Sequence, residues 1–151
     1  MASILPVTVD LDLLNITVNS KPSYRPAPNF DFKKGDFVRD AAGKIIYTDG
    51  HEAWRQWCIK TALTERDAYI AYTTNIGVEM DEAGRQRTRA ARLSAVERTI
   101  TEALMVHPMT ESVRAFEFKF LGDGSLAVSF DVYGENAAAF TIDLSYKAVG
   151  R

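Results

Sequence analysis

Three glutamates are the residues best placed by type and position for acid–base chemistry: Glu65, Glu79 and Glu102. Glycoside hydrolysis would need two carboxylates flanking a cleft, one of them with a raised pKa. Glu65 follows a predicted helix in a polar stretch, and Glu102 lies four residues after Arg98 on another predicted helix. Both are better interpreted as solvated or ion-paired surface residues. A peptidoglycan-degrading, lysozyme-type activity is therefore kept only as an alternative function.

The sequence contains no motif for metal, nucleophilic or phosphate chemistry. His51 and His107 lie at the ends of two different predicted helices, and no HxxxH, CxxC or HExxH spacing occurs. The nucleophile elbow GxSxG and the glycine-rich phosphate loops are absent as well. The single cysteine, Cys58, cannot form an internal disulfide and is expected to be a buried thiol of a protein made in a reducing cytoplasm. We therefore expect no enzyme activity, no metal and no cofactor.

Length and charge set the broad class of the protein. The chain has 151 residues, which is about one domain at roughly 100–200 residues per domain. Its formal net charge of -2 argues against nucleic-acid binding, which requires a clustered excess of Lys and Arg. No stretch approaches the roughly 18 consecutive apolar residues of a membrane helix. We expect a single soluble domain whose partners are neither nucleic acid nor membrane.

The chain divides into residues 1–29 and residues 30–151. The first part is punctuated by prolines and alternates apolar with polar residues near its start, so we expect an extended N-terminal arm rather than a helix or a signal peptide. The sequence leaves two alternatives open for it, an arm that orders against a partner and a floppy terminus. The second part is predicted to be the folded domain.

Two helices are predicted in residues 30–151. The first begins at Asp49, an N-cap with Glu52 three residues on, and carries Trp54 and Trp57 on an apolar stripe. These tryptophans are either core residues or a contact with a neighbouring chain. The second helix begins between residues 87 and 95, with a possible capping box at Ser94, and ends before Pro108. Between the two helices, residues 68–73 are predicted to form a strand.

The last third of the domain predicts a three-stranded antiparallel meander. Three segments alternate apolar and polar residues strictly, and they are joined by short turns at residues 122–124 and 134–136. The predicted fold is therefore α+β, with the two helices covering one face of the meander. The apolar residues of the three segments are Phe116, Phe118 and Phe120; Leu126, Val128, Phe130 and Val132; and Phe140, Ile142, Leu144 and Tyr146.

Two blocks of sequence together resemble one known family. The first is residues 50–66, GHEAWRQWCIKTALTER, followed by Tyr69, Tyr72 and Gly77. The second is residues 96–104, VERTITEAL, followed by residues 107–109 and the strand of residues 113–120. The order and spacing of these blocks are similar to those of the lysozyme-like baseplate wedge proteins, or sheath initiators, of contractile tails. The branch that the chain resembles most is that of PBSX-like prophages and phage tail-like bacteriocins, and the resemblance spans residues 30–146.

The resemblance implies a structural role and a set of partners. A member of this family joins the baseplate wedge of a virion or tail-like particle around the hub, and offers its terminal sheet to the first sheath ring. The implied partners are other wedge proteins, the tail sheath protein and the tail hub or tube, in a particle that holds several copies. Many members carry Glu-Pro-Arg after the second helix, whereas this chain has His107, Pro108 and Met109, so the ion pair of that contact cannot form and a more apolar contact is expected.

An exposed edge of the meander agrees with such a role, because an edge strand has unpaired backbone groups to which a partner strand can bind. The residues that we expect to meet partners are Thr141, Asp143 and Ser145 on the last strand, the turn of His107, Pro108 and Met109, and Trp54 and Trp57. A protein-binding adaptor unrelated to tails is the other non-enzymatic alternative. The sequence leaves open whether the particle is a phage, a bacteriocin or a secretion device.

Overall fold

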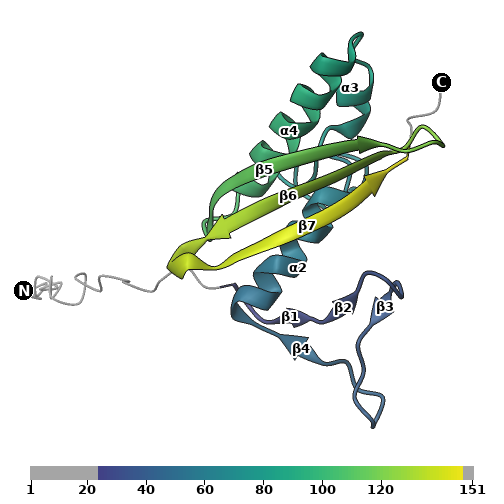
Figure 1. The fold of residues 1–151 in the computed structure, drawn as a ribbon. Coiled ribbons are helices and arrows are strands. Elements are labelled where there is room, and N and C mark those ends of the chain that lie inside the picture. Colours follow the sequence, from purple (N-terminus) through teal and green to yellow (C-terminus); the bar gives the residue numbers. More distant parts are fainter. Residues whose placement is uncertain (1–23, 148–151) are drawn as a thin grey trace, which may run out of the picture.

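The computed structural model describes residues 24–147, which form a three-stranded sheet, helices on one face of it, and a small lobe at its side (Figure 1). The helices are α2 (Gly50–Leu63), α3 (Met80–Gly84) and α4 (Arg89–Met105). The sheet strands are β5 (Thr110–Phe120), β6 (Leu126–Gly134) and β7 (Ala139–Tyr146), and a short 3-10 turn at Glu135–Ala137 precedes β7. This architecture confirms the predicted α+β fold.

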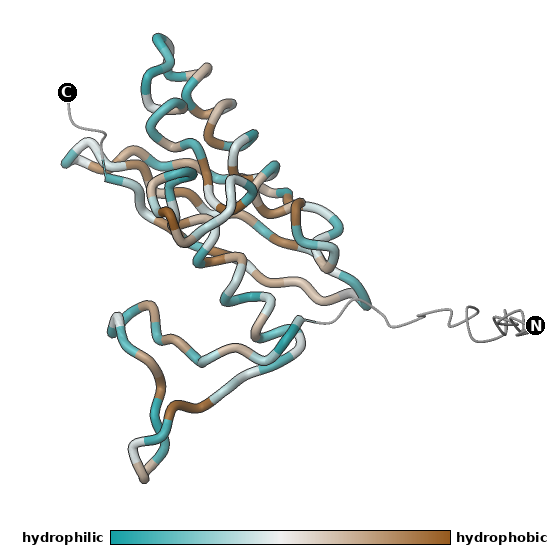
Figure 2. Tube along the Cα trace, turned by 180° about the vertical axis from the view of Figure 1, so that it is seen from behind, coloured by the Kyte–Doolittle hydropathy of each residue, from teal (hydrophilic) through white to brown (hydrophobic). Residues whose placement is uncertain are grey.

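The sheet is an antiparallel meander in the order β5-β6-β7. The alternation of apolar residues predicts its buried face correctly: Val128, Phe130 and Val132 of β6 and Ile142 of β7 are buried against the helices. Figure 2 shows the molecule from behind, where hydrophobic stretches of α2 and α4 meet the sheet. Phe130 and Ile100, which are both fully buried, belong to this core.

A β-bulge interrupts β5, which the sequence analysis does not predict. Arg114 pairs with Asp131 and Glu117 pairs with Ser129, so two residues of β5 oppose one residue of β6. Ala115 occupies the left-handed region there, with φ of 57°. The extra residue brings both Val113, which is buried, and Phe116 to the face toward the helices, because it shifts the alternation by one position.

Trp54 joins α2 to the sheet. Its side chain is fully buried, its Nε1 donates a hydrogen bond of 3.1 Å to Thr110 Oγ1, and its ring lies 4.9 Å from that of Phe140. At the other end of α2, Tyr146 donates a hydrogen bond of 2.8 Å from its hydroxyl to the carbonyl of Ala62. These two contacts hold α2 alongside β7, with the start of the helix near the start of the strand.

The helix caps differ from those that the sequence predicts. Asp49 is the N-cap of α2, but its side chain makes no cap hydrogen bond, and Gly50 after it has a positive φ of 57°. In α4 the cap is Thr88, whose Oγ1 accepts from the backbone N–H of Ala91 at 3.1 Å. Ser94 lies inside the helix, so the predicted capping box is wrong, although the helix begins within the predicted range.

Residues 68–73 are not a strand, which corrects the sequence-based prediction. They form turns in a loop that exposes Tyr69 and Ile70. Their β-branched and aromatic composition favours a strand only where a neighbouring strand and a core face are present, and the described residues provide neither at this place. The loop is closed at its base instead by a parallel bridge between Glu65 and Val78.

The lobe consists of two small antiparallel pairs, β1 (Ala27–Pro28) with β4 (Tyr47–Thr48) and β2 (Phe30–Asp31) with β3 (Asp36–Phe37). Buried Gln56 of α2 holds it in place: Gln56 Oε1 accepts from the backbone N–H of Phe30 at 3.1 Å, and Gln56 Nε2 donates to Asn29 Oδ1 at 2.9 Å. Residues 24–29 of the predicted arm belong to this lobe, and residues 1–23 lie outside the described residues.

Candidate protein interface

Strand β7 forms one edge of the sheet. Among the described residues it pairs only with β6, along its whole length from Ala139 to Tyr146. Thr141, Asp143 and Ser145 are exposed, as expected for the polar positions of the alternation, whereas Ile142 between them is buried. Thr141 Oγ1 donates a hydrogen bond of 2.6 Å to Asp131 Oδ1 on β6. On its outer side β7 therefore has backbone N–H and C=O groups that form no hydrogen bonds with another strand of the described part.

A groove of about 690 Å³ runs along this edge. One wall is the five consecutive residues of β7 from 141 to 145, and the opposite wall is the start of the lobe, residues 29–33 with Val38. The floor between them is one face of α2, formed by Glu52, Arg55, Gln56, Ile59 and Leu63. The groove is thus a space between a strand edge and a helix face that is polar at its start and apolar at its end.

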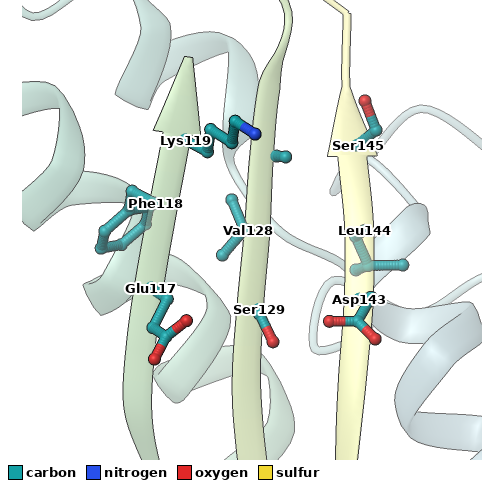
Figure 3. Close-up of a pocket in the computed structure, with 9 residues that line it drawn as sticks. Glu117, Phe118, Lys119, Val128, Ser129, Asp143, Leu144 and Ser145 are labelled. Atoms are coloured by element: carbon teal, nitrogen blue, oxygen red, sulfur yellow. The ribbon is translucent and has the colours of Figure 1, made fainter. Parts of the chain in front are cut away.

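The outer face of the sheet is hollowed beside the same edge. A shallow depression of about 390 Å³ lies over residues 117–119, 127–129 and 143–145, near the ends of β5 and β7 and the start of β6, where small residues leave space between longer ones. Figure 3 shows Glu117, Ser129 and Asp143 at one level across β5, β6 and β7, as their pairing requires. Two carboxylates therefore flank a serine on this face, and the ion pairs of the described residues involve neither of them.

The turn at His107, Pro108 and Met109 is largely built into the core. Met109 is buried, and its backbone N–H donates to His107 Nδ1 at 3.1 Å. The His107 ring lies between those of Tyr24 and Trp57, with centroid distances of 5.2 and 4.7 Å, and burial lowers the pKa of His107 below its ordinary value. Only Pro108 is exposed, so the side chain of Met109 cannot provide the apolar partner contact in this arrangement.

The two tryptophans have different environments. Trp54 is a core residue, so the partner-contact alternative does not apply to it in this fold. Trp57 is only partly buried and packs against the core beside His107. The structure therefore separates the predicted contact residues into an exposed set on β7, a half-buried set around His107, and buried Trp54 and Met109.

Two of the three candidate catalytic carboxylates, Glu65 and Glu79, form hydrogen bonds that hold the loop of residues 64–79. Glu65 accepts hydrogen bonds from the backbone N–H groups of Met80 (3.0 Å) and Asp81 (3.2 Å), and Glu79 accepts from Arg66 Nη1 at 2.9 Å. Burial raises the pKa of Glu65, while those two N–H groups act in the opposite direction. Glu65 is thus a half-buried cap of α3, rather than the solvated residue that the sequence suggested. Glu102 lies exposed on α4, as predicted.

Metal and thiol chemistry have no support in the described residues. Within 24–147, no group of three or more His, Cys, Asp and Glu side chains gathers at a distance suitable for a metal ion. Cys58 is fully buried, and burial raises the pKa of its thiol to about 12. No helix of the described part is long and apolar enough to cross a membrane.

Comparison with protein families matches residues 28–136 to the model described as contractile injection system sheath initiator. That match covers well over half of the 151 residues. The chain belongs to the sheath initiator family. The family match supports a structural role in a contractile injection system and a place in its particle, in contact with sheath and baseplate components. A comparison with curated proteins finds no match.

The matched residues contain the lobe, the helices, β5 and β6, and end before β7. The exposed residues on β7 were found from alternation alone, and the family match does not assign them a role. The opposite wall of the groove was missed, because the lobe residues that form it carry no local pattern that relates them to β7. The sequence feature related to this wall is Gln56, a polar residue near the apolar stripe of α2. In the structure its side chain forms hydrogen bonds to the lobe.

Proposed function

We propose that this member of the family joins the baseplate of a contractile particle and templates the first sheath ring by accepting a strand at the edge of β7. The observation that carries the proposal is that edge, which pairs with no strand of residues 24–147 on its far side and borders a groove of strand-like shape. A strand added there would gain main-chain hydrogen bonds along the five residues that line the groove. Several copies around the hub would present one such edge to each sheath subunit.

The same proposal makes the chain a non-enzymatic component. Two of the three candidate carboxylates are engaged in hydrogen bonds that fix a loop, and the third stands on an exposed helix face. This supports a structural role over a peptidoglycan-degrading activity. The family assignment likewise favours a tail component over an adaptor unrelated to tails.

Two proline variants test the strand addition. Successive N–H groups of a strand point to opposite sides, so one of Asp143→Pro and Leu144→Pro removes an outward donor while the other breaks the ladder to β6. The variant that retains the melting temperature of the parent chain identifies the outward donor, since proline is tolerated at a free edge.

In producing cells that lack the chromosomal copy, the stable variant should give baseplates without sheath, and the parent chain should restore sheathed particles. Electron microscopy of the purified particles measures the fraction that carries a sheath. Sheathed particles at the parental level with the stable variant would refute strand addition at β7.

A further inference from the structure

The groove beside β7 has two chemically different sides, and they constrain any strand that enters it. Side chains of an added strand alternate between the two faces of the sheet. On β7 itself, Ile142 is buried on the inner face, while Asp143 is exposed on the outer one. An added strand would follow the same division, with every second side chain directed toward α2 and the lobe.

The inner side of the groove is apolar at one end and polar at the other. Glu52, Arg55 and Gln56 line it near the start of α2, whereas Ile59 and Leu63 line it toward the end of the helix. Aromatic Phe30 and Phe32 alternate with polar residues on the wall formed by the lobe. Leu63 has 49% of its surface exposed, so its side chain offers apolar surface that an incoming strand could bury. Burying such a surface favours large apolar side chains in the inward positions of the added strand.

The outer side is acidic at one level of the sheet. Asp143 of β7 lies across from Ser129, and Ser129 from Glu117, so this row has two carboxylates (Figure 3). None of the ion pairs formed within residues 24–147 involves either carboxylate. Opposite charges directly across neighbouring strands are stabilising and like charges are destabilising. The next strand in this row is therefore favoured if it carries Lys or Arg there.

We propose that the occupant of the groove is an extended segment of a partner chain with apolar side chains inward where it passes Ile59 and Leu63, and a basic side chain outward, in register with Asp143. This inference rests on the proposed strand addition and specifies the chemistry of the strand. The five residues that line the groove correspond to about 17 Å of strand at roughly 3.3 Å per residue, so the segment needs to alternate over only about five positions. The alternation gives the inward fit, and the basic residue fixes the register.

Photo-crosslinking in the assembled particle identifies the occupant. A photoreactive amino acid is placed at Leu63 on the floor, at Ser145 on the outer side of the edge, and at exposed Glu102 on α4 as a control, and linked peptides are sequenced by mass spectrometry. We expect the first two probes to reach one extended segment of another chain, with an apolar residue linked to position 63 and a Lys or Arg in register with Asp143. The control probe should not link to that segment.

Charge reversal tests the register. Asp143→Lys should lower the fraction of chains that carry sheath by about five- to tenfold, and an acidic residue in place of the partner's basic residue should restore it. Glu102→Lys is the matched control, since it reverses an exposed acidic residue away from the groove and should have no effect.

The outcomes separate the two proposals. If the probe at Ser145 links to a partner strand but the probe at Leu63 meets polar residues, or Asp143→Lys leaves sheath content unchanged, the inferred chemistry is wrong while strand addition stands. Links from both probes to residues 1–23 of this chain or of a second copy would also overturn the inference. If neither probe links to any other chain, strand addition itself fails.

Discussion

The space around Gly134 is too small for an added methyl group. This residue ends β6 where the chain passes over α2, and a Cβ at this position would overlap the ring of Trp54 and lie 2.7 Å from the carbonyl oxygen of Met109. Trp54 is fully buried and held by its hydrogen bond to Thr110, so it cannot move aside cheaply. We predict that Gly134→Ala lowers the free energy of unfolding by about 2–3 kcal/mol, as overpacking in cores does.

The measurement is the urea midpoint of unfolding, followed by tryptophan fluorescence. Gly122→Ala is the matched control, because nothing lies within 4 Å of a Cβ there and its change should stay within about 0.5 kcal/mol. Equal losses in the two variants would mean that Trp54 is not packed against Gly134 as described.

Helix α4 is the element for which the sequence and the structure disagree about the cap, and the disagreement can be tested. The structure assigns the cap to Thr88, whose Oγ1 accepts from the N–H of Ala91, and places Ser94 inside the helix with an exposed side chain. Thr88→Ala should therefore cost about 1 kcal/mol of stability. Ser94→Ala should be neutral or slightly stabilising, because Ala is the better residue inside a helix.

Thermal or urea unfolding of the two variants decides between the caps. A loss at Ser94→Ala together with no change at Thr88→Ala would place the N-cap six residues, or more than one and a half turns, later than the structure has it. The start at Thr88 is accompanied by a local contact, in which Arg92 Nε donates to the carbonyl of Gln86 in the segment before the helix. Further along α4, Thr99 Oγ1 accepts from the backbone N–H of Glu79, the N-cap of α3.

The elements that the sequence predicts well are those whose pattern is local. Strict alternation predicts β6, β7 and the second half of β5 with most of their buried residues, because a period of two is sufficient to define the face of a strand. It misses buried Val113 and wrongly places Phe120, which is exposed, in the core. The bulge at Ala115 could not be predicted, since the left-handed conformation is usually marked by Gly and here is occupied by Ala. The strand predicted for residues 68–73 is wrong for the opposite reason. Their composition favours a strand, but no strand of the described part pairs with them.

The candidate interface exists only at the scale of the whole molecule. Its walls come from residues 29–38, α2 and β7, and the first and last of these are about a hundred positions apart in the sequence. Alternation predicts which side chains of β7 are exposed, but the distance of the lobe from the edge depends on Gln56 and its bonds to Asn29 and Phe30. This is why the exposed residues of the edge could be predicted and the groove could not.

Stability of the whole molecule should fall at alkaline pH because two acidic groups are buried in their protonated form. Burial raises the pKa of the Cys58 thiol to about 12 and also raises the pKa of Tyr146, whose hydroxyl bonds the carbonyl of Ala62. The unfolded values are about 8.5 for Cys and about 10 for Tyr. A folded pKa above the unfolded one gives stabilisation that is complete below the unfolded value and is lost as the pH rises toward the folded value.

We therefore predict a free energy of unfolding that, with respect to these two groups, is level up to about pH 8 and declines steadily from about pH 9 upward. Urea midpoints at several pH values between 7 and 11 provide the measurement. A Cys58→Ala, Tyr146→Phe double variant should start from a lower stability, since it loses a packed sulfur and a hydrogen bond worth about 1 kcal/mol, but should decline less steeply. Tyr47→Phe, at a tyrosine that is 64% exposed, is the control and should keep the parental slope. If the double variant declines as steeply as the parent chain, the alkaline loss arises elsewhere, and the contact of β7 with the end of α2 is not the buried link that the structure describes.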